Sequence, residues 1–150
     1  MLDRIRQFVA DLAVADERPA FAEDDHRVAA AALLVHLMEA DGVVAPEEKI
    51  ALHRLLRERF GLSDADADEL AAEGRERDEE AIDLYGFTSI LKDHLDRTER
   101  LRLIEMMWKM VFADGRVTEL EDNIVWRVSE LLGISTTDRI ALKQRVAAQG

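Results

Sequence analysis

Cysteine is absent from the sequence, and only two prolines occur among its 150 residues. Without cysteine the chain has no disulfide framework, no thiolate zinc site and no cysteine nucleophile. Few helix-breaking prolines and 48% hydrophobic residues make it too apolar for a disordered chain and favour helices. This length suits one domain with a core of its own. We therefore expect an all-α protein with a single domain over residues 1–150.

Basic residues are also scarce, with 20 Lys and Arg against 32 Asp and Glu and a formal net charge of −12. The resulting field repels phosphate backbones and anionic headgroups, so we exclude nucleic acid and membrane surfaces as direct partners. The same field attracts divalent cations and basic protein surfaces, although it also favours solubility.

The longest apolar run extends from Val28 to Met38. It is shorter than the about 20 residues that a membrane-spanning helix needs, so we expect no membrane insertion and a buried core helix instead. The first residues, Met1 to Val14, show amphipathic helical spacing and no continuous apolar stretch of a secretory signal,. We therefore expect a cytoplasmic location.

An acidic turn occurs twice, because the pattern A-D-G-x-V-x-x-x-E begins at Ala40 and again at Ala113. Each copy is followed by a helical stretch and then by apolar-Gly-apolar-Ser, at Phe60 to Ser63 and at Leu132 to Ser135. Two stacked copies bury faces that neither could bury alone. The repeat predicts a bundle of about seven or eight helices with an internally duplicated helix-turn-helix. We place the two copies at residues 25–63 and 97–135.

Capping signals divide the chain into helices. Asp24 or Asp25 is the expected N-cap of the apolar helix, which we expect to run to Asp41,. Pro46 suits the first position of the next helix, with Ile50 expected on its buried face. Capping boxes are expected at two later helices, where Asp96 pairs with Glu99 and Thr118 pairs with Glu121,.

The helix expected at residues 64–83 is strongly acidic and has a thin apolar stripe. This pattern is typical of a solvated helix, so we expect a loosely held link between the two copies. Ser63 is its expected N-cap.

Each acidic turn matches the second half of an EF-hand loop, in which a side-chain oxygen precedes an invariant glycine and a glutamate closes the site. The first half is missing, because Leu37 and Met110 stand where early acidic ligands belong. A full EF-hand is therefore rejected. A weaker site remains, and its hard oxygen donors suit Ca²⁺ or Mg²⁺. The six candidate ligands are Asp41, Glu47, Glu48, Asp114, Glu119 and Glu121.

The same residues also have a purely structural interpretation, in which the glycines end helices and Glu121 only completes a capping box. Asp41 and Asp114 do not fit this structural interpretation easily, because an acid at the carboxyl end of a helix faces the negative end of the helix dipole. Either the N–H groups of the turn or a bound cation must compensate them. Both alternatives stay open on the sequence alone.

No catalytic pattern emerges from the remaining residues. The four histidines lack ligand spacing, and no phosphate loop or activated nucleophile can be assembled,. His36 is expected to be a hydrogen-bonded core residue, and Trp108 and Trp126 to be packing anchors. The prediction is therefore that the protein is not an enzyme.

With both acidic turns identified, the chain resembles the tellurite-resistance TerB family and the related TerB-like domain at the amino terminus of the DjlA membrane co-chaperone. The resemblance is carried by Glu39 to Val44 with Glu47 and Glu48, and by Phe112 to Val117 with Glu119 and Glu121. It extends from about Asp25 to Val146. It implies a pseudo-symmetric helical bundle, metal-binding acids at the two turns, and a role in bacterial stress or tellurite resistance.

Two functional hypotheses follow. In the first, a non-enzymatic module binds a divalent cation weakly at its acidic turns and docks a protein partner. In the second, the chain is a pure interaction scaffold whose turns are only helix caps. The sequence names neither the partner nor the oligomeric state.

Overall fold

The structure is a computed structural model that describes residues 21–22, 25–81 and 83–149. The regular elements of these residues are all helical, and none of the residues forms a strand. The elements are α2 (His26–Met38), α3 (Pro46–Phe60), α4 (Asp64–Glu80), α5 (Tyr85–His94), α6 (Arg97–Val111), the 3₁₀ turn η1 (Phe112–Asp114), α7 (Glu119–Leu131) and α8 (Thr136–Gln149). The all-α prediction is confirmed. The helix expected within Met1 to Val14 lies outside the described residues.

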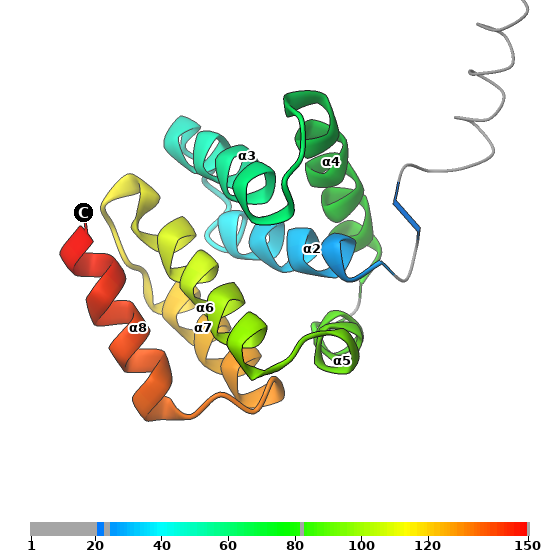
Figure 1. Cartoon of the computed structure of the whole chain (residues 1–150). Helices are drawn as coiled ribbons and strands as arrows, with labels where there is room; N and C mark the ends of the chain where they lie inside the picture. The colour runs from blue at the N-terminus through cyan, green and yellow to red at the C-terminus, as the bar shows by residue number, and fades with distance from the viewer. Residues whose placement is uncertain (1–20, 23–24, 82, 150) are drawn as a thin grey trace, which may run out of the picture.

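Helix α2 is the centre of the bundle. It packs against α3, α4, α5, α6 and α7, and Figure 1 shows α2 to α5 beside a second group formed by α6, α7 and α8. Every residue of α2 from Val28 to Met38 except His36 is buried. A helix that is apolar on all sides must be covered on all sides, so the apolar run is a core helix as predicted.

The prediction that α4 is loosely held is wrong. Ala67, Leu70 and Gly74 of α4 are buried, and a Cβ atom added to Gly74 would lie 2.7 Å from the Cβ of Ala31 in α2. The apolar stripe of α4 is thin because it is built from small residues. Small residues let two helix backbones approach closely, so a narrow stripe here gives a tight contact.

The helix starts predicted from capping residues are confirmed. The Asp25 carboxylate accepts from the N–H of Arg27 at 2.9 Å, Ser63 caps α4, and both predicted capping boxes are present. The predicted helix ends are too late, because α2 ends at Met38 instead of Asp41 and α4 ends at Glu80 instead of about residue 83. The residues after Met38 turn early, so that Asp41 lies in the connection to α3.

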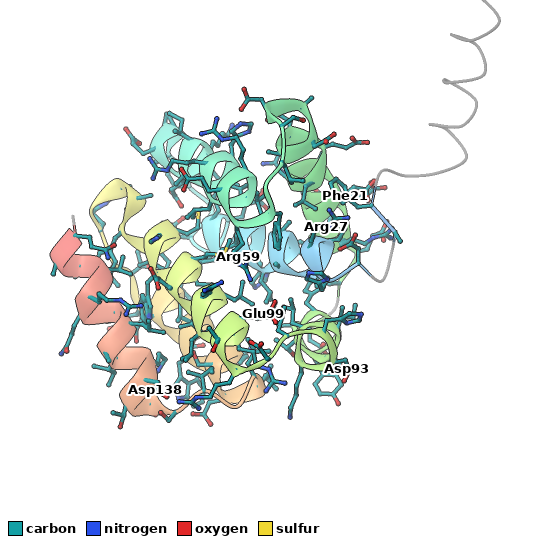
Figure 2. All side chains as sticks on the ribbon, in the orientation of Figure 1. Phe21, Arg27, Arg59, Asp93, Glu99 and Asp138 are labelled. Carbon is teal, nitrogen blue, oxygen red and sulfur yellow. The ribbon has the colours of Figure 1, made fainter. Side chains whose placement is uncertain are left out.

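Ion pairs and ring contacts join the elements at the surface. The Arg27 guanidinium lies 4.6 Å from the ring centroid of Phe21, which precedes α2, and Arg59 of α3 faces Glu99 of α6 at 3.7 Å (Figure 2). Among the helices of the described ranges, none combines the length and apolar character needed to span a membrane.

Two histidines connect α4 to its neighbours. His36 of α2 leaves the core, with its side chain 41% exposed, and its Nδ1 lies 2.8 Å from Oδ1 of Asp78. It is hydrogen-bonded as predicted but is not a core residue. His53 of α3 contacts Asp68 at 2.8 Å and Asp64 at 3.1 Å. These hydrogen bonds to carboxylates raise the pKa of both imidazoles above the usual 6.5,.

We expect Gly74→Ala to destabilise the protein by about 1–3 kcal/mol, because the new methyl group overlaps Ala31 in a contact between two backbones,. Gly86→Ala is the matched control, since a Cβ there meets no atom within 4 Å. Urea unfolding of both variants measures the difference, and equal stabilities would contradict the close α2–α4 contact.

We expect His36→Gln to lower the free energy of unfolding more at pH 6 than at pH 8. Asp78 raises the native pKa of His36 above 6.5, with Glu39 adding to this effect and Arg127 opposing it. The stabilisation is therefore complete below the unfolded-state pKa and is lost as pH rises through the native pKa. His94→Gln is the control, because His94 bonds a backbone carbonyl instead of a carboxylate. An equal loss at both pH values would contradict the pairing.

Candidate functional site

The first acidic turn is organised by its own hydrogen bonds. Gly42 adopts a φ of 77° and reverses the chain after α2,. Oδ1 of Asp41 then accepts from the N–H of Val43 at 3.0 Å. At the start of α3, Oε1 of Glu48 reaches back to accept from the N–H of Ala45 at 3.1 Å.

The second turn repeats this geometry. Gly115 has a φ of 81°, Oδ1 of Asp114 accepts from the N–H of Arg116 at 3.0 Å, and Oε1 of Glu121 accepts from the N–H of Thr118 at 3.0 Å. The side chain of Thr118 also caps the start of α7, because its hydroxyl accepts from the N–H of Glu121. Ala45 has no side-chain acceptor, so the first turn carries only half of the capping box.

These bonds answer part of the question that the sequence left open. The N–H groups of the turns supply one compensating contact for Asp41 and one for Asp114, as expected for aspartates in turns,. A cation is therefore not needed to explain the turn conformation. A cation could still neutralise the negative charge that the acidic residues of the two turns carry together.

Tertiary packing brings the two turns to the same end of the molecule. η1, which contains Asp114, packs against α3, and both connections lie at the left of the bundle in Figure 1. Burial raises the pKa of Glu48 above its usual 4.5, and the hydrogen bond from Ala45 opposes this shift. The charges of Asp114, Glu121 and Asp41 raise the pKa of Glu48 further.

The pKa of Glu121, in the second turn, is shifted by the same kinds of interaction as that of Glu48. Burial raises the pKa of Glu121, bonds from Thr118 oppose the shift, and the charges of Asp114 and Asp41 add to it. Four carboxylates from two distant parts of the chain thus repel one another. We call Asp41, Glu48, Asp114 and Glu121 the carboxylate cluster.

Within the part of the chain that the structure describes, the carboxylate cluster lacks basic counter-charges. Glu48 is 4% exposed and Glu121 is 6% exposed, although acids are rarely this buried without a partner. Over the described ranges, no ion pair joins any member of the cluster to Lys, Arg or His. The buried charge is instead stabilised by the capping N–H groups.

The other two predicted ligands lie apart from this arrangement. Glu47 and Glu119 are exposed on the first turns of α3 and α7, and no hydrogen bond or ion pair in the described part of the chain connects them to the cluster. Among those residues, no group of three or more His, Cys, Asp or Glu side chains is arranged to hold one metal ion.

Apolar side chains are exposed on the turns and on the helix starts that follow them. Their exposed fractions are 64% for Val43, 65% for Ile50, 40% for Val117 and 56% for Leu120. The prediction that Ile50 is buried is wrong, because two residues beyond Glu48 the helix has rotated by more than half a turn. Trp126 is 43% exposed and is not a packing anchor, whereas Trp108 is fully buried as predicted.

The sequence comparison matches the chain to a known family. The family model described as "Tellurite resistance protein TerB" matches residues 27–144 and so includes both acidic turns. The chain belongs to the TerB family. No curated protein matches it.

The fold of this chain is also similar to that of a solved structure. This TerB-family chain is similar to the crystal structure of a protein of unknown function from Porphyromonas gingivalis W83, with 17% sequence identity and a TM-score of 0.59. The match covers 83% of this chain and 98% of the other. At this identity the likeness supports the shared fold.

Sequence reasoning did not join the two turns into one site. It treated Asp41 with Glu48, and Asp114 with Glu121, as separate candidates. The available signal was the repeat itself, because pseudo-symmetric copies that stack about a common core bring equivalent turns close together.

We expect Glu48→Gln to stabilise the protein at pH 7, because the amide oxygen still accepts from Ala45 while the buried charge is removed. Glu48→Ala loses the cap and should destabilise by about 0.5–2 kcal/mol. The native pKa of Glu48 is raised above 4.5, so protonated Glu48 favours the native state at low pH and this contribution is lost as pH rises. The advantage of Gln should therefore shrink on acidification.

Urea unfolding at pH 7 and near pH 4 measures this difference between the two variants. Glu58→Gln is the control, because Glu58 lies exposed on the same helix away from the turns. If Glu48→Gln were as destabilising as Glu48→Ala at pH 7, the charge itself would be needed for stability.

Proposed function

We propose that this TerB-family protein is a non-enzymatic helical module that binds a divalent cation weakly at its paired acidic turns and docks a protein partner beside them. The observation that carries the proposal is the carboxylate cluster, in which Glu48 and Glu121 are buried among like charges and have no basic partner among the described residues. A cation bound at this end of the bundle would relieve that repulsion.

The chemistry of the cluster favours Ca²⁺ or Mg²⁺, because carboxylate oxygens are the ligands that these hard cations prefer. Each carboxylate uses one oxygen, Oδ1 or Oε1, in the bonds that shape its turn. The second oxygen is the donor proposed for the cation. Since no three ligands converge in the described residues, the ion would retain much of its water and bind weakly.

The exposed apolar residues support the docking part of the proposal. Val43, Ile50, Val117 and Leu120 flank the acidic turns, so the surface that we propose combines negative charge with apolar area. A basic amphipathic segment of another protein has the complementary chemistry. No reaction is proposed, because metal-assisted hydrolysis needs a denser ligand set than the turns supply. A role in tellurite resistance is proposed from the family description alone, and a broader role in bacterial stress from the resemblance to the TerB family.

The alternative is a pure interaction scaffold. It is favoured by the capping bonds, which give all four carboxylates a structural role without an ion. In that case, replacing Val43 and Leu120 with serine would weaken partner binding, and EDTA would have no effect.

Thermal unfolding with and without millimolar Ca²⁺ or Mg²⁺ tests the cation proposal. A ligand at ten times its Kd stabilises the native state by about 1.4 kcal/mol, which raises Tm by about 2–6 °C in a protein of this size. The informative variant combines Asp41→Asn with Asp114→Asn, because each amide keeps the turn acceptor and removes the charge. We expect this variant to lose the cation response.

The control variant combines Glu69→Gln with Glu76→Gln, which removes the same charge from exposed positions of α4 and should keep the response. Sodium chloride at matched ionic strength controls for screening. A flat response, or one that salt reproduces, would reject the cation site and leave the scaffold alternative.

A further inference from the structure

A groove between α7 and α8 contains the exposed indole of Trp126. The two helices pack against each other, and the groove between them has a volume of about 380 Å³. Trp126 and Val117 line it, and 43% and 40% of their surfaces are exposed. Tryptophan is enriched among the residues that carry most of the binding energy of interfaces, because its large ring gains most from being covered by a partner.

Three polar side chains of the groove have no partner within the described part of the chain. No hydrogen bond or ion pair there involves the carboxylate of Glu119, the side-chain amide of Asn123 or the guanidinium of Arg139. The other two charged groups of the lining, Asp122 and Lys143, are bonded to each other at 2.8 Å, so their charges cancel. The groove therefore presents one unpaired acid, one unpaired base and one unpaired amide to a ligand.

The bond between Asp122 and Lys143 sets the register of the two helices. Helix α8 follows α7 through a short connection, and the two helices run antiparallel (Figure 1),. Glu119 therefore lies about one turn to one side of this bond, whereas Trp126 and Arg139 lie about one turn to the other side. The unpaired acid and the unpaired base are thus at opposite ends of the groove, and the indole is at the end of the base.

The spacing along α7 sets the length of a matching ligand. Glu119, Asn123 and Trp126 share one helix face, because they follow one another at intervals of four and three residues,. The helix rises about 10 Å from Glu119 to Trp126, a distance that an extended peptide covers with about three residues. The amide of Asn123 offers the donor and acceptor pair that a peptide group requires. An extended peptide therefore matches both the length and the polar groups of the groove.

We propose that this groove binds an extended peptide segment of a partner protein, in which a basic residue pairs with Glu119 and an aromatic residue three positions away stacks on Trp126. Asn123 bonds the peptide backbone between these two contacts. Arg139 pairs with a carboxylate beside the aromatic residue. The charges of the segment are thus complementary to those at the two ends of the groove.

The inference deepens the docking part of the proposed function, and it rests on that proposal for the existence of a protein partner. Val117 connects the two, because it lines the groove and also belongs to the exposed apolar surface beside the acidic turns. No member of the carboxylate cluster lines the groove, so the bound cation is not required.

NMR titrations that follow the backbone amides and the indole N–H groups test the groove with acetylated and amidated pentapeptides. The probe is Lys-Ala-Ser-Phe-Asp, in which Phe stands three positions from Lys and beside Asp. The control peptide is Lys-Phe-Ala-Ser-Asp, which has the same composition and charge but a different spacing. We expect the probe to cause saturable shifts of the Trp126 indole and of α7 near Glu119. The control peptide should bind at least about fivefold more weakly.

Variants of the groove test the individual contacts. Trp126→Ser should weaken binding of the probe at least about tenfold, because it removes the stacking surface. Glu119→Gln should weaken binding about two- to fivefold, as expected for the loss of an exposed ion pair. Glu130→Gln is the matched control, because Glu130 is exposed on the same helix and does not line the groove. It should leave the affinity unchanged.

The same titrations separate the groove from the rest of the proposed function. The Val43→Ser, Leu120→Ser variant and the Asp41→Asn, Asp114→Asn variant should both retain binding of the probe, because none of these four residues lines the groove. If the probe binds and the cation response is absent, the cation site fails and the groove stands. If the cation response is present and the probe does not bind, only the groove fails.

The inference is overturned if the probe causes no saturable shifts, or if its shifts are centred outside the α7–α8 groove. Equal affinities of the two peptides would also overturn it, because the spacing of the charged and aromatic residues would then play no part. A loss of affinity in Glu130→Gln as large as that in Glu119→Gln would show that only the net charge of the protein attracts the peptide.

Discussion

Burial of α2 on all sides is the constraint on which the rest of the structure depends. Because nearly every side chain of this helix is apolar, no face of it can be left to water, and the remaining helices take positions that cover it,. Small residues refine this arrangement. Alanines on α2 and Gly74 on α4 allow the two backbones to approach closely, so the most acidic of the described helices packs against the most apolar one.

The packing around α2 also explains why like charges accumulate at one end of the bundle. The first acidic turn follows α2 directly, and the second, through η1, packs on α3 beside it. Each carboxylate is useful locally, since Asp41 and Asp114 shape turns and Glu48 and Glu121 cap helices. Their combination is electrostatically unfavourable, because burial raises the pKa of both glutamates and the charges of the neighbouring acids raise it further. Such a conflict between local stabilisation and collective repulsion is typical of a functional site.

Much of the fold could be predicted because its signals are local. The N-caps at Asp25 and Ser63 and the two capping boxes are confirmed, since a cap depends on residues within a few positions of one another. Apart from the early helix ends, the errors concern contacts between helices. The thin apolar stripe of α4 predicts a loosely held helix, although the small residues of this stripe allow a close contact with Ala31. Ile50 and Trp126 were assigned to the core by their apolar character, but their helix faces meet solvent.

The sequence by itself determined the all-α class, the helix caps, the two left-handed glycines of the acidic turns and membership of the TerB family, because each depends on neighbouring residues or on the order of residues along the chain,. Only the tertiary structure decided that Asp41, Glu48, Asp114 and Glu121 act on one another and that Glu119, Asn123, Trp126 and Arg139 line one groove. The reason is physical. Coulombic and hydrogen-bonding interactions depend on distances through space, and these distances are set by how the helices pack around α2.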